Sequence, residues 1–279
     1  MKQLDYRQTP EEKLSIINDI FPILYKRFEN LSERSDRAAR KSKAYPYYAQ
    51  METTVQDSGK WIIYAVFMNK PTSSRGIYFQ FHAFQTYTIT NARNSQNNGL
   101  GLFHITAQGS QLNIEADEYP PHCINRMVQR LPEQHILYMD ISGLTRFILK
   151  DNIQGALTLI RSNKTIHCGQ VDVPTTVTST PYGQFLGVSF SENYVCHLTF
   201  ISNREMHLPQ HAVNNFLDSL STKVTDYKSL TNSQISQEQM DEILSGLGCD
   251  QMLDEAWQLI SDESRDYSIA ARITGHIDD

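Results

Sequence analysis

Residues 51–67 read METTVQDSGKWIIYAVF, and they indicate the fold class more directly than any other stretch of the chain. Two runs of β-branched and aromatic residues, 51–56 and 60–68, flank Asp57-Ser58-Gly59, a sequence typical of a hairpin turn. Similar runs predict further strands before the middle of the chain, at 77–84, 86–90, 102–107 and 112–116. Successive hairpins of this kind predict a largely antiparallel sheet that curves.

The pattern of the flanking sequence completes an α+β prediction. Ahead of the sheet, Thr9 as a cap, Pro10 in a first turn and apolar residues at helical spacing predict a helix over 9–43, which Pro22 should kink or divide. Its basic end, residues 33–43, is either a solvated face or a patch that contacts phosphate. Beyond the meander we expect inserted helices at 119–131 and 142–150, and strands at 156–160, 165–168, 175–178, 185–190 and 194–201. The polar stretch 221–236 predicts a linker to a helical C-terminal tail.

These elements predict three parts: an N-terminal helical segment (1–44), an α+β core domain (45–222), and a linker with a helical tail (223–279). The chain has 279 residues, a formal net charge of −6 and 40% hydrophobic residues, as expected for a globular protein that does not bind nucleic acid over its whole surface. No apolar run is long enough to span a bilayer, and the first residues lack the apolar centre of a secretory signal. Four dispersed cysteines predict reduced thiols and a cytoplasmic protein without a membrane partner.

Several common signatures of nucleotide, metal and nucleophile sites are missing from the sequence. It contains no P-loop, no dinucleotide-type glycine motif, no H-E-x-x-H and no G-x-S-x-G. Of the nine histidines, His207 and His211 have the i, i+4 spacing of a helical metal pair, but Pro209 lies between them. We therefore expect no cofactor and no metal site.

Residues 119–131, YPPHCINRMVQRL, are the best candidate for a functional site. Prolines at the entry suit a helix start, and from there His122, Arg126 and Arg130 recur at every fourth position on one face. An imidazole can transfer protons near neutral pH, and guanidiniums can bind phosphate through two hydrogen bonds. The alternative is an exposed basic face, or arginines that pair with acids such as Asp117 and Glu118.

The same stretch resembles the H-x-x-x-R-M-x-x-R segment of small RelE-like toxins in the barnase–colicin–RelE ribonuclease superfamily. The resemblance implies that His122, Arg126 and Arg130 face the scissile phosphate of an RNA and that no metal takes part. It further implies that a strand within 194–206 (YVCHLTFISNREM) supplies Thr199 to position the substrate. The chain departs from this family in its length, its acidic charge and its helical additions. Its general character also resembles that of bacterial or phage-related proteins.

Two hypotheses on function follow. The first is a metal-independent, toxin-type ribonuclease centred on His122, Arg126, Arg130 and Thr199, with RNA bound through a local basic patch. The second is a non-enzymatic binding protein that contacts a protein partner through its terminal helices and its aromatic-rich strands. The alternative for those aromatic residues is packing in the core.

Overall fold

A computed structural model of the chain describes Leu4 and residues 8–68, 70, 79–89, 99–108, 113–131, 141–153, 157–168 and 171–206. The predicted linker and helical tail lie outside the described residues. The chain forms two compact units. Among the described residues, the first unit holds those up to His122 together with Ser189–Cys196, and the second holds Cys123–Val188 and those from His197 onward. The predicted domain limits at residues 44 and 222 stay a prediction.

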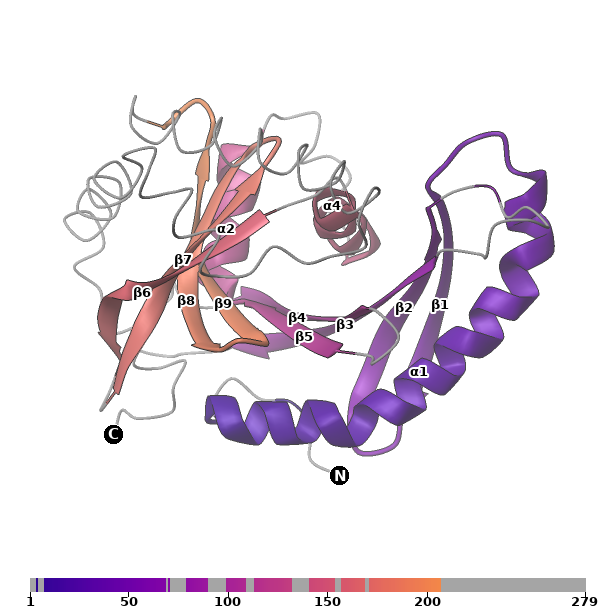
Figure 1. The fold of residues 1–279 in the computed structure, drawn as a ribbon, viewed down its shortest axis with the longest axis horizontal. Helices are drawn as coiled ribbons and strands as arrows, with labels where there is room; N and C mark the ends of the chain where they lie inside the picture. The colour runs from indigo at the N-terminus through magenta and orange to yellow at the C-terminus, as the bar shows by residue number, and fades with distance from the viewer. Residues whose placement is uncertain are drawn as a thin grey trace. The chain divides into compact units, whose positions relative to one another are not determined.

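The first unit begins with one long helix, α1 (Pro10–Lys41), as the N-terminal pattern predicted. Thr9 and Glu12 form a reciprocal capping box, in which each side chain accepts a hydrogen bond from the other's backbone N–H. The helix is continuous through Pro22, so of the two alternatives expected there the division is wrong and the kink stays a prediction. α1 packs on the sheet of the first unit, where it contacts β1, β2 and β3 (Figure 1).

The sheet of the first unit is an antiparallel meander, which confirms the prediction from residues 51–67. Its strands are β1 (Tyr47–Val55), β2 (Gly59–Phe67), β3 (Phe79–Ile89), β4 (Gly99–Gln108) and β5 (Asn113–Tyr119). The start of β9 (Tyr194–Ser202) pairs with β5 in parallel, from Ala116↔Tyr194 to Glu118↔Cys196.

The strand β3 replaces the two strands expected at 77–84 and 86–90. Gln85 separated them in the sequence pattern, but it continues the ladder opposite Phe103. Its side chain is buried and donates a hydrogen bond to the carbonyl of Ser58 in the β1–β2 turn. A polar residue inside a strand is tolerated where it has such a partner.

The core of the first unit lies between α1 and one face of this sheet. Strand residues of one parity, such as Trp61, Ile63 and Phe81, meet the apolar side of α1. Phe81 contacts the rings of Phe21 and Phe28 edge-on, at centroid distances of 5.5 and 5.2 Å. This packing fixes the N-terminal half of α1 on the sheet.

The second unit contains helix α4 (Ile141–Ile153), antiparallel strands and most of α2 (Pro121–Arg130). Its strands are β6 (Leu157–Cys168), β7 (Val171–Thr180), the greater part of β8 (Gly183–Ser191), and β9 from His197 onward. Strand β6 is continuous where two strands were expected, and its pairing with β7 shifts register between Arg161 and Thr165. Pro174 pairs at this irregularity, where a proline's missing N–H costs little. Together the two units establish an α+β fold with a mostly antiparallel sheet.

Candidate functional site

Helix α2 has the two faces that the sequence predicted. Cys123, Ile124 and Met127 are buried, whereas Arg126 and Gln129 are exposed. Burial raises the pKa of the Cys123 thiol, which is therefore not the nucleophile of a site on this helix. The back of α2 thus anchors the helix, and its polar face lies at the surface.

Arg130, in the last turn of α2, is held by the end of β9. Its guanidinium donates a hydrogen bond to the carbonyl of Phe200, and its Nε lies 3.1 Å from a carboxylate oxygen of Glu205. Ser202 also donates to that carboxylate, from its hydroxyl at 2.9 Å. Arg130 is therefore oriented by an ion pair, but its partner is not Asp117 or Glu118, the acids considered from the sequence.

The four predicted site residues fall in both units. His122 is half-buried and belongs to the first unit, while Arg126, Arg130 and Thr199 belong to the second. Thr199 is half-buried on β9, next to the residue whose carbonyl binds Arg130. Arg126 is exposed, and no ion pair or hydrogen bond joins it to another described residue. Within the second unit, the structure therefore brings Arg130 to the strand of Thr199 and leaves Arg126 open to solvent.

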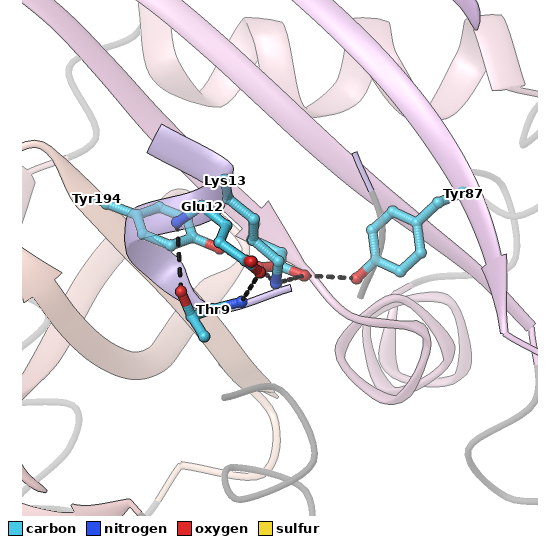
Figure 2. Close-up of polar contacts among 6 residues, drawn as sticks. Thr9, Glu12, Lys13, Tyr87 and Tyr194 are labelled. Carbon is cyan, nitrogen blue, oxygen red and sulfur yellow. Dashed lines mark hydrogen bonds and ion pairs between the residues drawn. The ribbon is translucent and has the colours of Figure 1, made fainter. Parts of the chain in front are cut away.

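A second cluster of polar groups lies inside the first unit, around Glu118 of β5. The Lys13 ammonium of α1 binds both carboxylate oxygens of Glu118, at 2.9 and 3.2 Å, and both side chains are fully buried. Tyr87 donates to the same carboxylate at 2.9 Å, and Tyr194 donates to its other oxygen. Figure 2 shows Tyr87 and Tyr194 on opposite sides of Lys13. The Lys13 nitrogen also lies 5.5 Å from the centre of the Phe103 ring.

This Glu118 cluster (Lys13, Tyr87, Glu118 and Tyr194) is fully paired. The carboxylate accepts two hydrogen bonds from lysine and one from each tyrosine. Burial, and next the charge of Glu118, raise the pKa of Tyr194 well above its usual value, so this tyrosine remains a donor. A buried carboxylate with every partner in place joins α1 to β5, β3 and β9, and its role is to hold the first unit together.

The sequence contains a signal for this pair, but the signal is a pattern of burial and not a motif. Lys13 lies on the same helix stripe as the buried Ile17, Ile20 and Leu24. Glu118 alternates with Ile114 and Ala116 on the core side of β5. A lysine on an apolar helix stripe and a glutamate on an apolar strand face each require a buried partner of opposite charge.

The other face of the same sheet carries a buried histidine pair. Nδ1 of His82 lies 3.0 Å from Nε2 of His104, and Nε2 of His82 lies 3.3 Å from the Gln80 side-chain oxygen. The second nitrogen of His104 lies 3.7 Å from the carboxylate of Asp117. The His104 ring also stacks on Phe84 at a centroid distance of 4.2 Å. Asp117 and Glu118 are consecutive in β5 and therefore serve opposite faces of the sheet.

The histidine pair predicts that acid destabilises the first unit. Burial, and next the charge of His104, hold the pKa of His82 well below 6.5, and Asp117 offsets this only in part. In the unfolded chain His82 binds a proton as the pH falls through about 6.5, whereas in the folded chain it stays neutral to a lower pH. The free energy of unfolding is therefore highest above about pH 6.5 and decreases as the pH falls below it. We expect a loss of up to about 1.4 kcal/mol per pH unit. The measurement is the urea midpoint at about pH 7.5 and about pH 5.5.

The matched variant for this measurement is His82→Phe, which keeps an aromatic ring in the buried position and cannot bind a proton. Its urea midpoint should change less between the two pH values than that of the wild type. An equal change in both proteins would show that His82 does not cause the acid sensitivity.

Among the described residues, no three His, Cys, Asp or Glu side chains are grouped to hold a metal ion. Within the same part of the chain, no helix is both long and apolar enough to cross a bilayer. His207 and His211 lie outside it. No family model, curated protein or solved structure matches the chain.

Proposed function

We propose that the polar face of α2 binds RNA and cleaves its phosphodiester backbone without a metal ion, as a toxin-type ribonuclease does. The observation that carries the proposal is the folded form of α2, with an apolar back that is buried and an arginine that is exposed in front. Cleavage through the ribose 2′-hydroxyl requires a base, an acid and a group that stabilises negative charge, and it requires no cofactor.

Each of the four residues has a distinct part in this proposal. His122 takes the proton of the 2′-hydroxyl as this oxygen bonds to phosphorus, and gives it to the 5′-oxygen as the bond from phosphorus to that oxygen breaks. Arg126, which is exposed and without an ion pair among the described residues, binds the phosphate. Arg130 is already held by Glu205, so it positions the end of α2 against β9 and contributes charge only in part. Thr199 positions the substrate from the strand.

The cellular setting belongs to the same proposal. Cys123 and Cys196 are buried, and neither forms a disulfide. Free thiols fit a reducing compartment, and we place the protein in the cytoplasm of a bacterium.

The experiment is RNA cleavage by the purified chain in EDTA, with His122→Ala and Arg126→Ala beside the wild type. We expect cleavage to persist in the chelator. We expect it to fall at least about 100-fold in each variant, the usual cost of losing a proton-transfer group or a charge-stabilising group. Gln129→Ala is the matched control, because Gln129 is exposed on the same helix and has no assigned part in the reaction.

Two results would contradict the ribonuclease proposal. One is equal cleavage by all four proteins, which would indicate a contaminating nuclease. The other is the absence of cleavage by folded wild-type protein across RNAs of different sequence and structure. Circular dichroism of each variant shows whether α2 and the sheet remain folded.

One observation favours a second candidate function, a binding protein without catalysis. The carboxylate of Glu205 offsets the charge of Arg130. An arginine that stabilises a reacting phosphate should instead have its charge available to the substrate, so this ion pair disfavours catalysis. The aromatic residues of the strands would not form the surface of such a binding protein. Trp61, Tyr64 and Phe81 are buried, which agrees with the alternative from the sequence that these aromatic residues pack in the core. The variants of α2 would then leave binding of a partner unchanged.

A further inference from the structure

The C-terminal half of α1 packs against the core of the first unit much less than its N-terminal half does. Up to Phe28 the helix has a continuous row of buried residues, but from Glu29 to Lys41 only Ser32 and Ala39 are buried. Packing stabilises most helices in proteins, so an extended segment with so little packing requires another reason for its length. Its side chains indicate what this reason is.

The charges on this half of α1 are sorted by sign. Arg27, Arg34, Arg37 and Lys41 lie at spacings of seven, three and four residues, which places them along one helix stripe, and all four are exposed. We call these four residues the basic stripe. At 1.5 Å per residue the stripe is about 21 Å long. Residues 26–43 contain seven lysines and arginines and three acids, in a chain whose net charge is −6.

The acids of the same segment form no ion pair with the basic stripe. Asp36 forms an ion pair with Arg40, at 2.7 Å. No ion pair or hydrogen bond joins a side chain of the basic stripe to another described residue. Opposite charges one turn apart can stabilise a surface helix, and Glu33 lies one turn before Arg37 without forming an ion pair with it. A row of four open cations is instead suited to a partner with regularly repeated negative charge.

We propose that the basic stripe binds the phosphodiester backbone of a single RNA strand. Three of its four cations are guanidiniums, which bind phosphate oxygens through two parallel hydrogen bonds. The inference extends the proposed function, since it assigns a binding surface for RNA on the first unit. It does not require that α2 cleaves RNA.

The chemistry of α1 disfavours the other anionic partners. A helix that lies on a membrane inserts large apolar side chains, whereas the apolar side of α1 is buried against the sheet. Among the described residues of α1, Ile23 is its one large apolar residue that is exposed, at 36%. An acidic peptide presents its carboxylates at irregular spacing and has no condensed counterions to release.

The test compares two variants with the same net charge. The first, the stripe variant, changes Arg27, Arg34, Arg37 and Lys41 to Gln, which is also a good helix former. The second, the control variant, changes four exposed cations elsewhere, Lys60, Arg146, Lys150 and Arg204, to Gln. The probe is a fluorescent single-stranded 2′-O-methyl oligoribonucleotide, which keeps the phosphate backbone but cannot be cleaved through a 2′-hydroxyl. Binding is measured by anisotropy between about 50 and 200 mM salt.

We expect the stripe variant to bind the probe at least about tenfold more weakly than the control variant. The slope of log K against log salt should become shallower by about 3, since each lost phosphate contact on a single strand accounts for about 0.7. Equal affinity and slope in the two variants would overturn the proposal. So would a wild-type protein that binds phosphatidylserine vesicles or polyglutamate through the stripe but does not bind the probe. Because the probe cannot be cleaved, the binding measurement gives the same result whether or not α2 cleaves RNA. The two proposals can therefore fail separately.

Discussion

Lys13→Met should destabilise the first unit by about 3–5 kcal/mol, the cost of removing one partner from a buried ion pair. The methionine side chain fills most of the space of the lysine stem, so the loss arises mainly from Glu118, which remains buried without a cation. Tyr87 and Tyr194 still donate to the carboxylate, but neutral donors do not balance its charge.

The measurement is urea unfolding followed by the fluorescence of Trp61, which is fully buried in the first unit. A Trp257→Phe background leaves Trp61 as the sole tryptophan of the chain. This readout reports the first unit even where the two units unfold separately. Lys26→Met is the control, because Lys26 is an exposed lysine on the same helix. A loss below about 1 kcal/mol, the range of a surface ion pair, would contradict the structural role of Lys13.

The double variant Lys13→Met/Glu118→Gln separates the ion pair from the packing. With both charges removed, no carboxylate is left uncompensated, and the glutamine can still accept a hydrogen bond from a tyrosine. Neutral replacements of buried ion pairs are often tolerated without loss of stability. We therefore expect the double variant to recover most of the stability lost in Lys13→Met. A double variant as unstable as the single one would show that packing of the Lys13 stem, and not its charge, stabilises the first unit.

The elements that could be predicted from the sequence are those whose signals are local. The helix α1 has a capping box and an apolar period, and the β1–β2 hairpin has its turn and two flanking runs. For α2, the same local period gave the buried and exposed faces of the helix correctly. Gln85 shows the limit of this approach. A polar residue interrupts the pattern of β3, and only the distant carbonyl of Ser58 explains why the strand continues.

The contacts that could not be predicted join residues far apart in the chain. Lys13 and Glu118 are 105 positions apart, and the local pattern around each indicates a need for a partner but not which one. The same reason accounts for the parallel pairing of β5 with β9, and for the choice of Glu205 as the partner of Arg130. In each case several residues of suitable charge or strand pattern compete, and the topology of the whole sheet selects among them.

Gly183→Ala should destabilise the second unit by about 3 kcal/mol, the upper end of the cost of overpacking. A Cβ atom at this position would clash with the carbonyl oxygen of Ile201 and would lie 2.7 Å from the ring of Phe200. The first of these atoms belongs to the backbone of β9, so no rotation of a side chain relieves the clash. The turn is also fixed on the other side, since the Thr180 hydroxyl accepts from the N–H of Gly183 at 3.2 Å.

The expected change is a loss of amide hydrogen-exchange protection in residues 175–188, with the protection of β1–β4 in the first unit unchanged. Glu192→Ala, an exposed change in the β8–β9 turn, is the control and should leave both regions protected. Because Arg130 donates to the carbonyl of Phe200, a shift of β9 at Phe200 and Ile201 also moves the anchor of α2. RNA cleavage should then fall in Gly183→Ala even though His122 and Arg126 are intact. Unchanged hydrogen-exchange protection of residues 175–188 in this variant would contradict the prediction. It would mean that β9 can shift to accommodate the Cβ atom without loss of stability, so that glycine is not required at position 183.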